Sequence, residues 1–247
     1  MEIHILNGDA LLDRFIAANI PGTFIIVREA LIEGPVQAKT LTDFWELRAG
    51  YFSTDNKARY YEKVVSEFEK LKHVNKDAAI HLWFEDDLFC QVNMWFTIDH
   101  LYNLELSSKL YRVFPIIPEE DYRWSGFGNL NSSQLKDCYQ KRIAFSSDDV
   151  LLAKNLWTSY SSKNLPALKN LSLIPSGCFH DLQQVVQAHL DRFPKSGETG
   201  RPEKILQQII NSGYTEFDDI FKKFYINEGG IYGFGDVQVK SILARMN

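Results

Sequence analysis

Acidic, basic and amide side chains follow three short apolar segments of the chain, residues 3–6, 23–27 and 78–84. Carboxylates grouped in this way could bind a divalent cation or act as a general base, and an arginine could hold a phosphate or a carboxylate. The sequence assigns no catalytic residue, metal or cofactor to these places. The candidate ligand-binding residues there are Gly8, Asp9, Arg28, Glu29, Glu85 and Gln91.

Each of these acids also has a purely structural interpretation. Asp9 and the acidic run 85–87 precede segments with helical spacing, so they could cap helices instead of binding a ligand. Gly8 would let a ligand approach the backbone, and Arg28 could either hold the charge of Glu29 or face the ligand's anion. If Asp9 and Glu29 form the acidic core of a site, Asp9→Asn and Glu29→Gln should weaken binding without lowering the melting temperature.

Other polar side chains lie within apolar surroundings. His4 and His81 are inside apolar segments and would pair if the two strands are neighbours. Asn93 and Gln91 follow Cys90 on an apolar helix, where buried amides either line a pocket or brace a loop. Cys90 has no evident histidine partner and is a weak candidate nucleophile. Arg48, beside Trp45, either binds an anion or is a solvated arginine next to a core tryptophan, and the second role is favoured.

Known catalytic and metal-binding motifs are missing from the sequence. Asn7-Gly8-Asp9 lacks the glycines and the lysine of a P-loop and is not a dinucleotide fingerprint. The G-x-S-x-G, H-E-x-x-H and protein-kinase patterns are also lacking. The three cysteines are far apart with no C-x-x-C spacing, which argues against a zinc ribbon or a disulfide framework and for a reducing compartment.

The apolar segments 3–6, 23–27, 78–84 and 110–117 alternate with helical spacing. This alternation predicts an α/β fold: an open, largely parallel four-strand sheet with helices on both faces. After residue 118 the pattern turns helical, with one helix over 132–145. The expected divisions are an α/β domain over 1–118, a helical connecting region over 119–194 and a small helical module over 195–247, whose glycine-rich turn is compatible with a winged-helix-like arrangement.

Charge and hydropathy limit the partners. The net charge is −5, and residues 195–247 carry seven basic and seven acidic side chains, so nucleic acid is not an expected partner. The first residues lack the pattern of a secretory signal, and no apolar run is long enough to span a membrane. The expected location is therefore the cytoplasm, without membrane association.

Four segments together resemble a bacterial family called domain of unknown function 1835: HILNGD (4–9), REALIEGP (28–35), LWFEDDLFCQVN (82–93) and YGFGD (232–236). The resemblance spans nearly the whole chain and implies a bacterial cytoplasmic protein with this layout. It implies no activity, substrate or catalytic residue. From the residues themselves, the last segment is expected to form a structural turn, with Phe234 buried and Asp236 capping the final helix, or alternatively a binding loop.

Two classes of function are compatible with these observations. The first is a protein or enzyme that binds a small anionic or phosphorylated molecule at the carboxyl ends of the parallel strands. The second is a regulatory or interaction protein whose helical C-terminal half binds a protein or a nucleic acid. Convergence of Asp9, Arg28, Glu29 and Glu85 around an open pocket would favour the first class. Their dispersal as caps and surface charges would favour the second.

Overall fold

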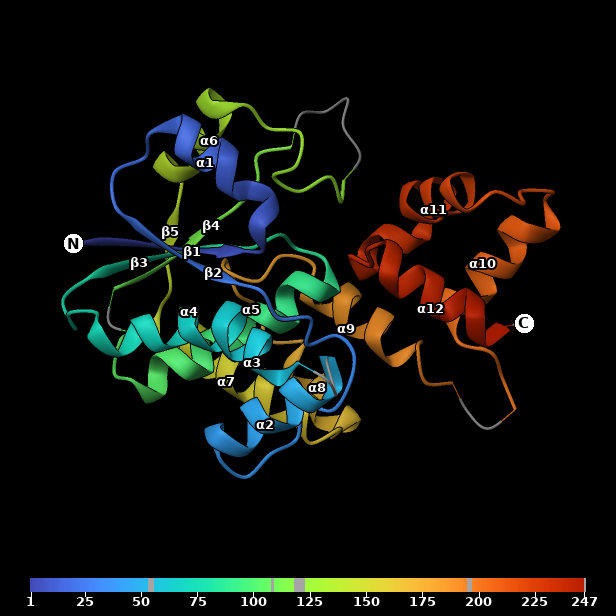
Figure 1. The fold of residues 1–247 in the computed structure, drawn as a ribbon, viewed down its shortest axis with the longest axis horizontal. Coiled ribbons are helices and arrows are strands. Elements are labelled where there is room, and N and C mark those ends of the chain that lie inside the picture. Colours follow the sequence, from blue (N-terminus) through green and yellow to red (C-terminus); the bar gives the residue numbers. More distant parts are fainter. Residues whose placement is uncertain (53–55, 108, 118–122, 195–196, 247) are drawn as a thin grey trace.

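The computed structural model describes residues 1–52, 56–107, 109–117, 123–194 and 197–246. At the centre of this described part lies a sheet of five strands in the order β2-β1-β3-β4-β5 (Figure 1). The first four strands are parallel, and β5 runs antiparallel to β4. The predicted α/β class with a largely parallel sheet is therefore confirmed. The strands are β1 (Glu2–Asn7), β2 (Thr23–Val27), β3 (Ala79–Trp83), β4 (Leu110–Val113) and β5 (Ile143–Ala144).

The fifth strand was not predicted. The sequence pattern predicts one helix over 132–145, but α6 (Ser132–Gln140) ends earlier, and Ile143 and Ala144 pair with β4. A two-residue strand has no alternation that a sequence pattern could reveal. At the opposite edge of the sheet, the Ile26 amide of β2 donates to Glu67 Oε2 at 3.2 Å. A short strand and a carboxylate thus shield the two edges from pairing with another chain.

Helices cover both faces of the sheet, as predicted. On one face, α1 and α6 pack over a core cluster that contains Trp83. On the other face, α5 is buried along most of its length because it lies between the sheet and α7. The helices of these layers are α1 (Leu12–Ala18), α2 (Leu41–Phe52), α3 (Lys57–Tyr60), α4 (Ser66–Glu69), α5 (Leu88–Asn103) and α7 (Ser147–Ser161).

His4 and His81 pair across the sheet. The register of β1 and β3 places them opposite one another, and their rings stack with centroids 4.9 Å apart. His4 Nε2 donates to the Pro21 carbonyl at 3.1 Å, and His4 Nδ1 accepts from Trp83 Nε1 at 3.0 Å. Burial lowers the pKa of His4 to about 4, so it is a neutral core residue.

The C-terminal half is helical. In Figure 1, α9 leads from the α/β part to a separate group of helices, α10 to α12, which we call the C-terminal module. No helix in the described part of the chain is long and apolar enough to cross a membrane. The helices are α8 (Leu165–Leu171), α9 (Leu182–Leu190), α10 (Arg201–Asn211), α11 (Phe217–Ile226) and α12 (Asp236–Met246).

A tight turn docks the C-terminal module against α5. Gly233 has a φ of +61°, and a Cβ there would overlap the Asp87 carboxylate and lie 3.0 Å from Phe89 Cβ. Phe234 is buried, as predicted for a structural turn. The next helix begins at Asp236, and the Gln238 side chain reaches back to accept from the Gly235 amide at 3.0 Å. Glycine is therefore required at 233 for both its backbone angle and its lack of a side chain.

We expect Gly233→Ala to lower the free energy of unfolding by roughly 2–4 kcal/mol, because left-handed backbone strain adds to steric overlap with Asp87. Gly213 is a matched control, since its φ is +94° and no atom lies within 4 Å of a Cβ built there. Gly213→Ala should cost only about 1 kcal/mol. Chemical denaturation of both variants measures the difference, and equal losses would contradict the docking contact.

Candidate functional site

The strand order reverses between β1 and β3, and in open α/β sheets ligands bind beyond the carboxyl ends of strands at such a switch point. Two predicted positions, Gly8 and Glu85, follow these strands. Other parts of the chain cover the acids that follow β3. Gly126 lies against the Glu85 side chain, and Gly233 lies against Asp87. The space beside these acids is therefore occupied by protein.

Glu85, Asp87 and Cys90 form a compact cluster beneath this cover. The Cys90 thiol donates to Glu85 Oε2 at 3.1 Å and accepts from Asn7 Nδ2 at 3.0 Å. Asp87 Oδ1 accepts from the Cys90 amide at 2.9 Å, which confirms that the acidic run caps α5. One potential ligand atom from each of the three residues lies within 4.8 Å of the others, so these residues could hold a metal ion.

Burial sets the protonation of this cluster. Burial, aided by the charge of Glu85, raises the pKa of Asp87 from 3.8 to about 7. Burial, aided by the charge of Asp87, also raises the pKa of the Cys90 thiol well above its usual value. Cys90 therefore stays a thiol at neutral pH and is a poor nucleophile, although it lies in the first turn of a helix.

Asp9 and Arg28 form a salt bridge on the surface. Arg28 Nε and Nη2 each donate to the Asp9 carboxylate at 2.8 Å, and Arg28 Nη1 donates to the Lys63 carbonyl at 2.9 Å. These bonds to Arg28 lower the pKa of Asp9. The Asp9 side chain caps no helix, so that prediction is wrong: Asp9 reaches across to the end of β2 instead. Arg28 therefore pairs with Asp9 and leaves Glu29 to another partner.

Glu29 is fully buried and pairs with Arg48, which is fully buried too. Arg48 Nη2 lies 2.9 Å from Glu29 Oε2, and the Tyr60 hydroxyl donates to Glu29 Oε1. Arg48 also donates to the backbone carbonyls of Glu33 at 2.8 Å and of Pro35 at 3.2 Å. Arg48 is therefore neither a solvated arginine nor an open anion site. The ion pair fixes the loop that follows β2.

The two amides of α5 have different roles. Asn93 Oδ1 accepts from the Leu31 amide at 3.1 Å, and its Nδ2 donates to the Glu29 carbonyl at 2.7 Å. Asn93 thus braces the loop after β2. Gln91 Nε2 donates to the backbone carbonyls of Asp86 and His180, both at 2.9 Å, and Gln91 is fully buried.

The predicted site residues therefore lie in three separate places and not around one pocket. Asp9 and Arg28 are at the surface, Glu29 is buried with Arg48, and Glu85 lies under Gly126. Asp9 and Glu29 do not form a common acidic core, because each has its own arginine. Their dispersal does not support a ligand site built from these residues at the strand ends.

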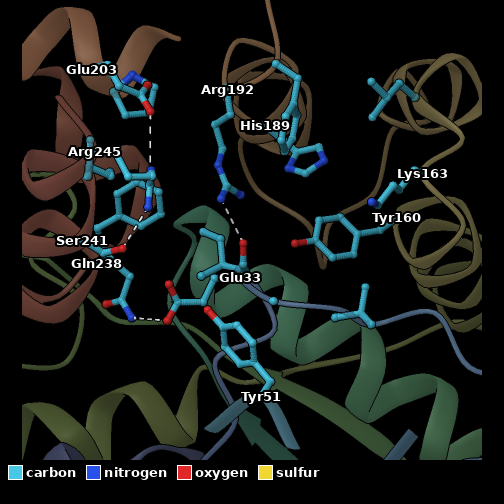
Figure 2. Close-up of a pocket in the computed structure, with 18 residues that line it drawn as sticks. Glu33, Tyr51, Tyr160, Lys163, His189, Arg192, Glu203, Gln238, Ser241 and Arg245 are labelled. Carbon is cyan, nitrogen blue, oxygen red and sulfur yellow. Dashed lines mark hydrogen bonds and ion pairs between the residues drawn. The ribbon is translucent and has the colours of Figure 1, made fainter. Parts of the chain in front are cut away.

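A cleft lies further along the loop that leaves β2. It has a volume of about 490 Å³, which is in the range of small-molecule sites. One wall is formed by the loop and α2, and the other walls by α9, the C-terminal module and the junction of α7 with α8 (Figure 2). Its polar and aromatic lining consists of Glu33, Tyr51, Tyr160, Lys163, His189, Arg192, Phe193, Glu203, Phe234, Gln238, Ser241 and Arg245.

Arg192, His189 and Glu203 of this lining carry buried polar atoms that lack partners within the described residues, and the Glu203 atom is a carboxylate oxygen. Arg192 Nη2 donates to the Ile32 carbonyl at 3.0 Å, but its Nη1 is buried without an acceptor. His189 is 5% exposed, and its Nδ1 has no partner. Burial and the neighbouring Arg192 lower the pKa of His189 to about 3, so its ring is neutral. Atoms of this kind also occur in the core, at Trp45 and Trp95, and either a bound water or a ligand can satisfy those that line the cleft.

Sequence reasoning missed the basic residues of the cleft, Lys163, Arg192 and Arg245, because each lies at or near a helix end with nothing unusual around it. A partial signal existed in two of the segments behind the family resemblance. The segment 28–35 supplies Glu33, and 232–236 supplies Phe234. These segments are about 200 residues apart in sequence and line the same cleft.

No protein-family model matches the sequence, and the searches of curated proteins and of solved structures found no significant match. The resemblance to domain of unknown function 1835 therefore stays a prediction.

The structure revises the expected behaviour of Glu29→Gln. We expect this substitution to lower the free energy of unfolding by about 3 kcal/mol, because it leaves the buried charge of Arg48 unpaired. Asp9→Asn breaks a salt bridge in which the Asp9 side chain is 59% exposed. The free energy of unfolding should therefore fall by less than about 1 kcal/mol. Urea denaturation checks both values. A Glu29→Gln variant as stable as Asp9→Asn would show that the ion pair does not fix the loop.

Asp87 should make stability depend on pH. Since its pKa rises from 3.8 to about 7 on folding, the folded chain holds the extra proton between these values. The free energy of unfolding should therefore fall as pH rises from about 4 to about 7, by at most about 1.4 kcal/mol per pH unit. Asp87→Asn keeps the cap and remains neutral, so its denaturation midpoints should fall less over this range. If the denaturation midpoints of parent and variant changed with pH by the same amount, Asp87 would not be protonated in the folded chain.

Proposed function

We propose that the protein binds a small anionic molecule in the cleft beyond the carboxyl end of β2. The observation that carries this proposal is the state of Arg192. Its guanidinium lines the cleft beside the Tyr160 hydroxyl and 5.4 Å from the Phe234 ring centroid, has a buried Nη1 without a well-formed hydrogen bond, and forms no ion pair within the described residues. Arg192 is partly buried, and its guanidinium, which is always charged, has no carboxylate partner among the described residues. A ligand anion would supply the missing partner.

Two further cations support the same ligand chemistry. Lys163 is exposed, lines the cleft and has no ion-pair partner within the described residues. Arg245 lies 4.0 Å from Glu203 and donates to Ser241 Oγ at 2.8 Å. Three cationic side chains therefore face two carboxylates, Glu33 and Glu203, whereas the whole chain has a net charge of −5. The local excess of positive charge favours an anion.

The apolar lining is suited to holding the rest of a small molecule. Tyr51 comes from α2, Tyr160 from α7 and Phe234 from the turn before α12. A bound molecule would therefore contact the α/β part and the C-terminal module at once. Because binding to the folded state alone stabilises a protein, an anion should raise its melting temperature.

We expect inorganic phosphate to raise the melting temperature of the parent protein. Arg192→Gln should weaken its binding roughly 10- to 100-fold, the usual effect of losing a hydrogen bond to a charged group. Lys163→Gln should also weaken phosphate binding. It is the second test variant, for the case that Arg192→Gln loosens the loop at Ile32. Lys169→Gln is the matched control, since Lys169 is exposed on α8 and does not line the cleft.

The measurements are thermal unfolding and isothermal titration calorimetry. The proposal fails if phosphate leaves the parent's melting temperature unchanged, or if Arg192→Gln and Lys163→Gln bind phosphate as tightly as Lys169→Gln does.

A further inference from the structure

The cleft holds a fixed carboxylate as well as its cations. Glu33 Oε1 accepts from Gln238 Nε2 at 2.8 Å, and Gln238 is itself held because its Oε1 accepts from the Gly235 amide at 3.0 Å. The Glu33 carbonyl accepts from Arg48 Nη1 at 2.8 Å. Contacts at both its backbone and its side chain thus orient Glu33. Its carboxylate accepts hydrogen bonds but donates none at neutral pH, so a ligand group beside it must be a donor.

His189 adds a neutral polar contact. Its ring is nine-tenths or more buried, and Figure 2 shows it on α9 near Tyr160, on the cleft side of the helix. The Tyr160 hydroxyl is already used, since it donates to the Leu31 carbonyl at 2.9 Å. A neutral imidazole with a free Nδ1 fits a hydroxyl group, which can donate or accept.

Figure 2 shows how these groups lie. His189 extends from α9 and Arg192 from the residues just beyond it. Lys163 approaches from the side of Tyr160, and Glu33 lies with Tyr51 below Arg192. The cleft therefore presents cations for an anion together with a carboxylate and an imidazole for neutral donors.

Resting on the proposed anion site, we propose that the ligand is a phosphorylated sugar, either free or as part of a nucleotide. A phosphate monoester carries a charge of about −1.5 to −2 at pH 7, which matches Arg192 and Lys163. The sugar hydroxyls would donate to Glu33 and contact His189, while Tyr51 and Phe234 pack against the ring. A simple inorganic anion would offer the Glu33 carboxylate no donor beyond Gln238.

The test compares four probes by isothermal titration calorimetry at pH 7.5: inorganic phosphate, ribose, ribose 5-phosphate and adenosine 5′-monophosphate. On the parent protein, ribose 5-phosphate should bind at least about tenfold more tightly than phosphate, the effect of one added hydrogen bond to a charged group. Ribose alone should bind more weakly than ribose 5-phosphate. Tighter binding of the nucleotide would identify a nucleotide as the source, and equal binding would identify a free sugar phosphate.

The Glu33→Gln variant distinguishes the binding of the sugar from the binding of the phosphate. Glutamine keeps an oxygen that can accept from Gln238, so the fold should be retained. The ratio of the variant's affinity for ribose 5-phosphate to its affinity for phosphate should fall about tenfold. Its affinity for phosphate alone should not fall, because the substitution removes a negative charge from the cleft. Arg192→Gln should weaken both. If Glu33→Gln does not fold, the comparison of the four probes on the parent protein decides the sugar-phosphate proposal.

Two results would overturn the sugar-phosphate proposal while leaving the anion site intact: ribose 5-phosphate and the nucleotide binding no more tightly than phosphate, or Glu33→Gln weakening phosphate as much as ribose 5-phosphate. If none of the phosphate-containing probes binds the parent, the anion site itself is wrong.

Discussion

The buried ion pair between Glu29 and Arg48 is the interaction on which the rest of the cleft depends. Both side chains are fully shielded from solvent, and removing two charges from water is tolerated only when nearly every donor and acceptor is satisfied. Arg48 meets this condition by bonding to Glu29 and to three carbonyls of the following loop, those of Ala30, Glu33 and Pro35. The path of the loop over residues 29–35 therefore follows from the need to pair one arginine.

That loop is the common contact of helices from distant parts of the chain. Asn93 of α5 binds the Leu31 amide, and Tyr160 of α7 binds the Leu31 carbonyl. Arg192, just beyond α9, binds the Ile32 carbonyl, and Gln238 of α12 binds the Glu33 carboxylate. The cleft thus forms where these helices meet around a loop whose shape is already set. The C-terminal module is held a second time where Gly233 packs on Asp87.

The sequence predicted the layers of the fold better than the site. Strands 23–27 and 78–84 were visible because buried parallel strands are continuous apolar runs, and the cap at Asp87 was visible because capping is local. The sequence did not predict the two-residue strand β5 or the role of Arg48, since both depend on residues distant in sequence. Asp9 was expected to cap a helix, but a nearby arginine from β2 binds it instead. Arg192 could not be recognised, because the lack of an ion-pair partner among the described residues depends on its surroundings in space and not on its neighbours in sequence.

We propose an anion site against the loop after β2 and not at the covered ends of β1 and β3. The most direct measurement is a crystal structure of the protein soaked with tungstate, an oxyanion that resembles phosphate and gives a strong anomalous signal. We expect an anomalous peak within hydrogen-bond distance of Arg192, with Lys163 beside it. A peak beside Gly8, or one at Arg28 with none in the cleft, would contradict it.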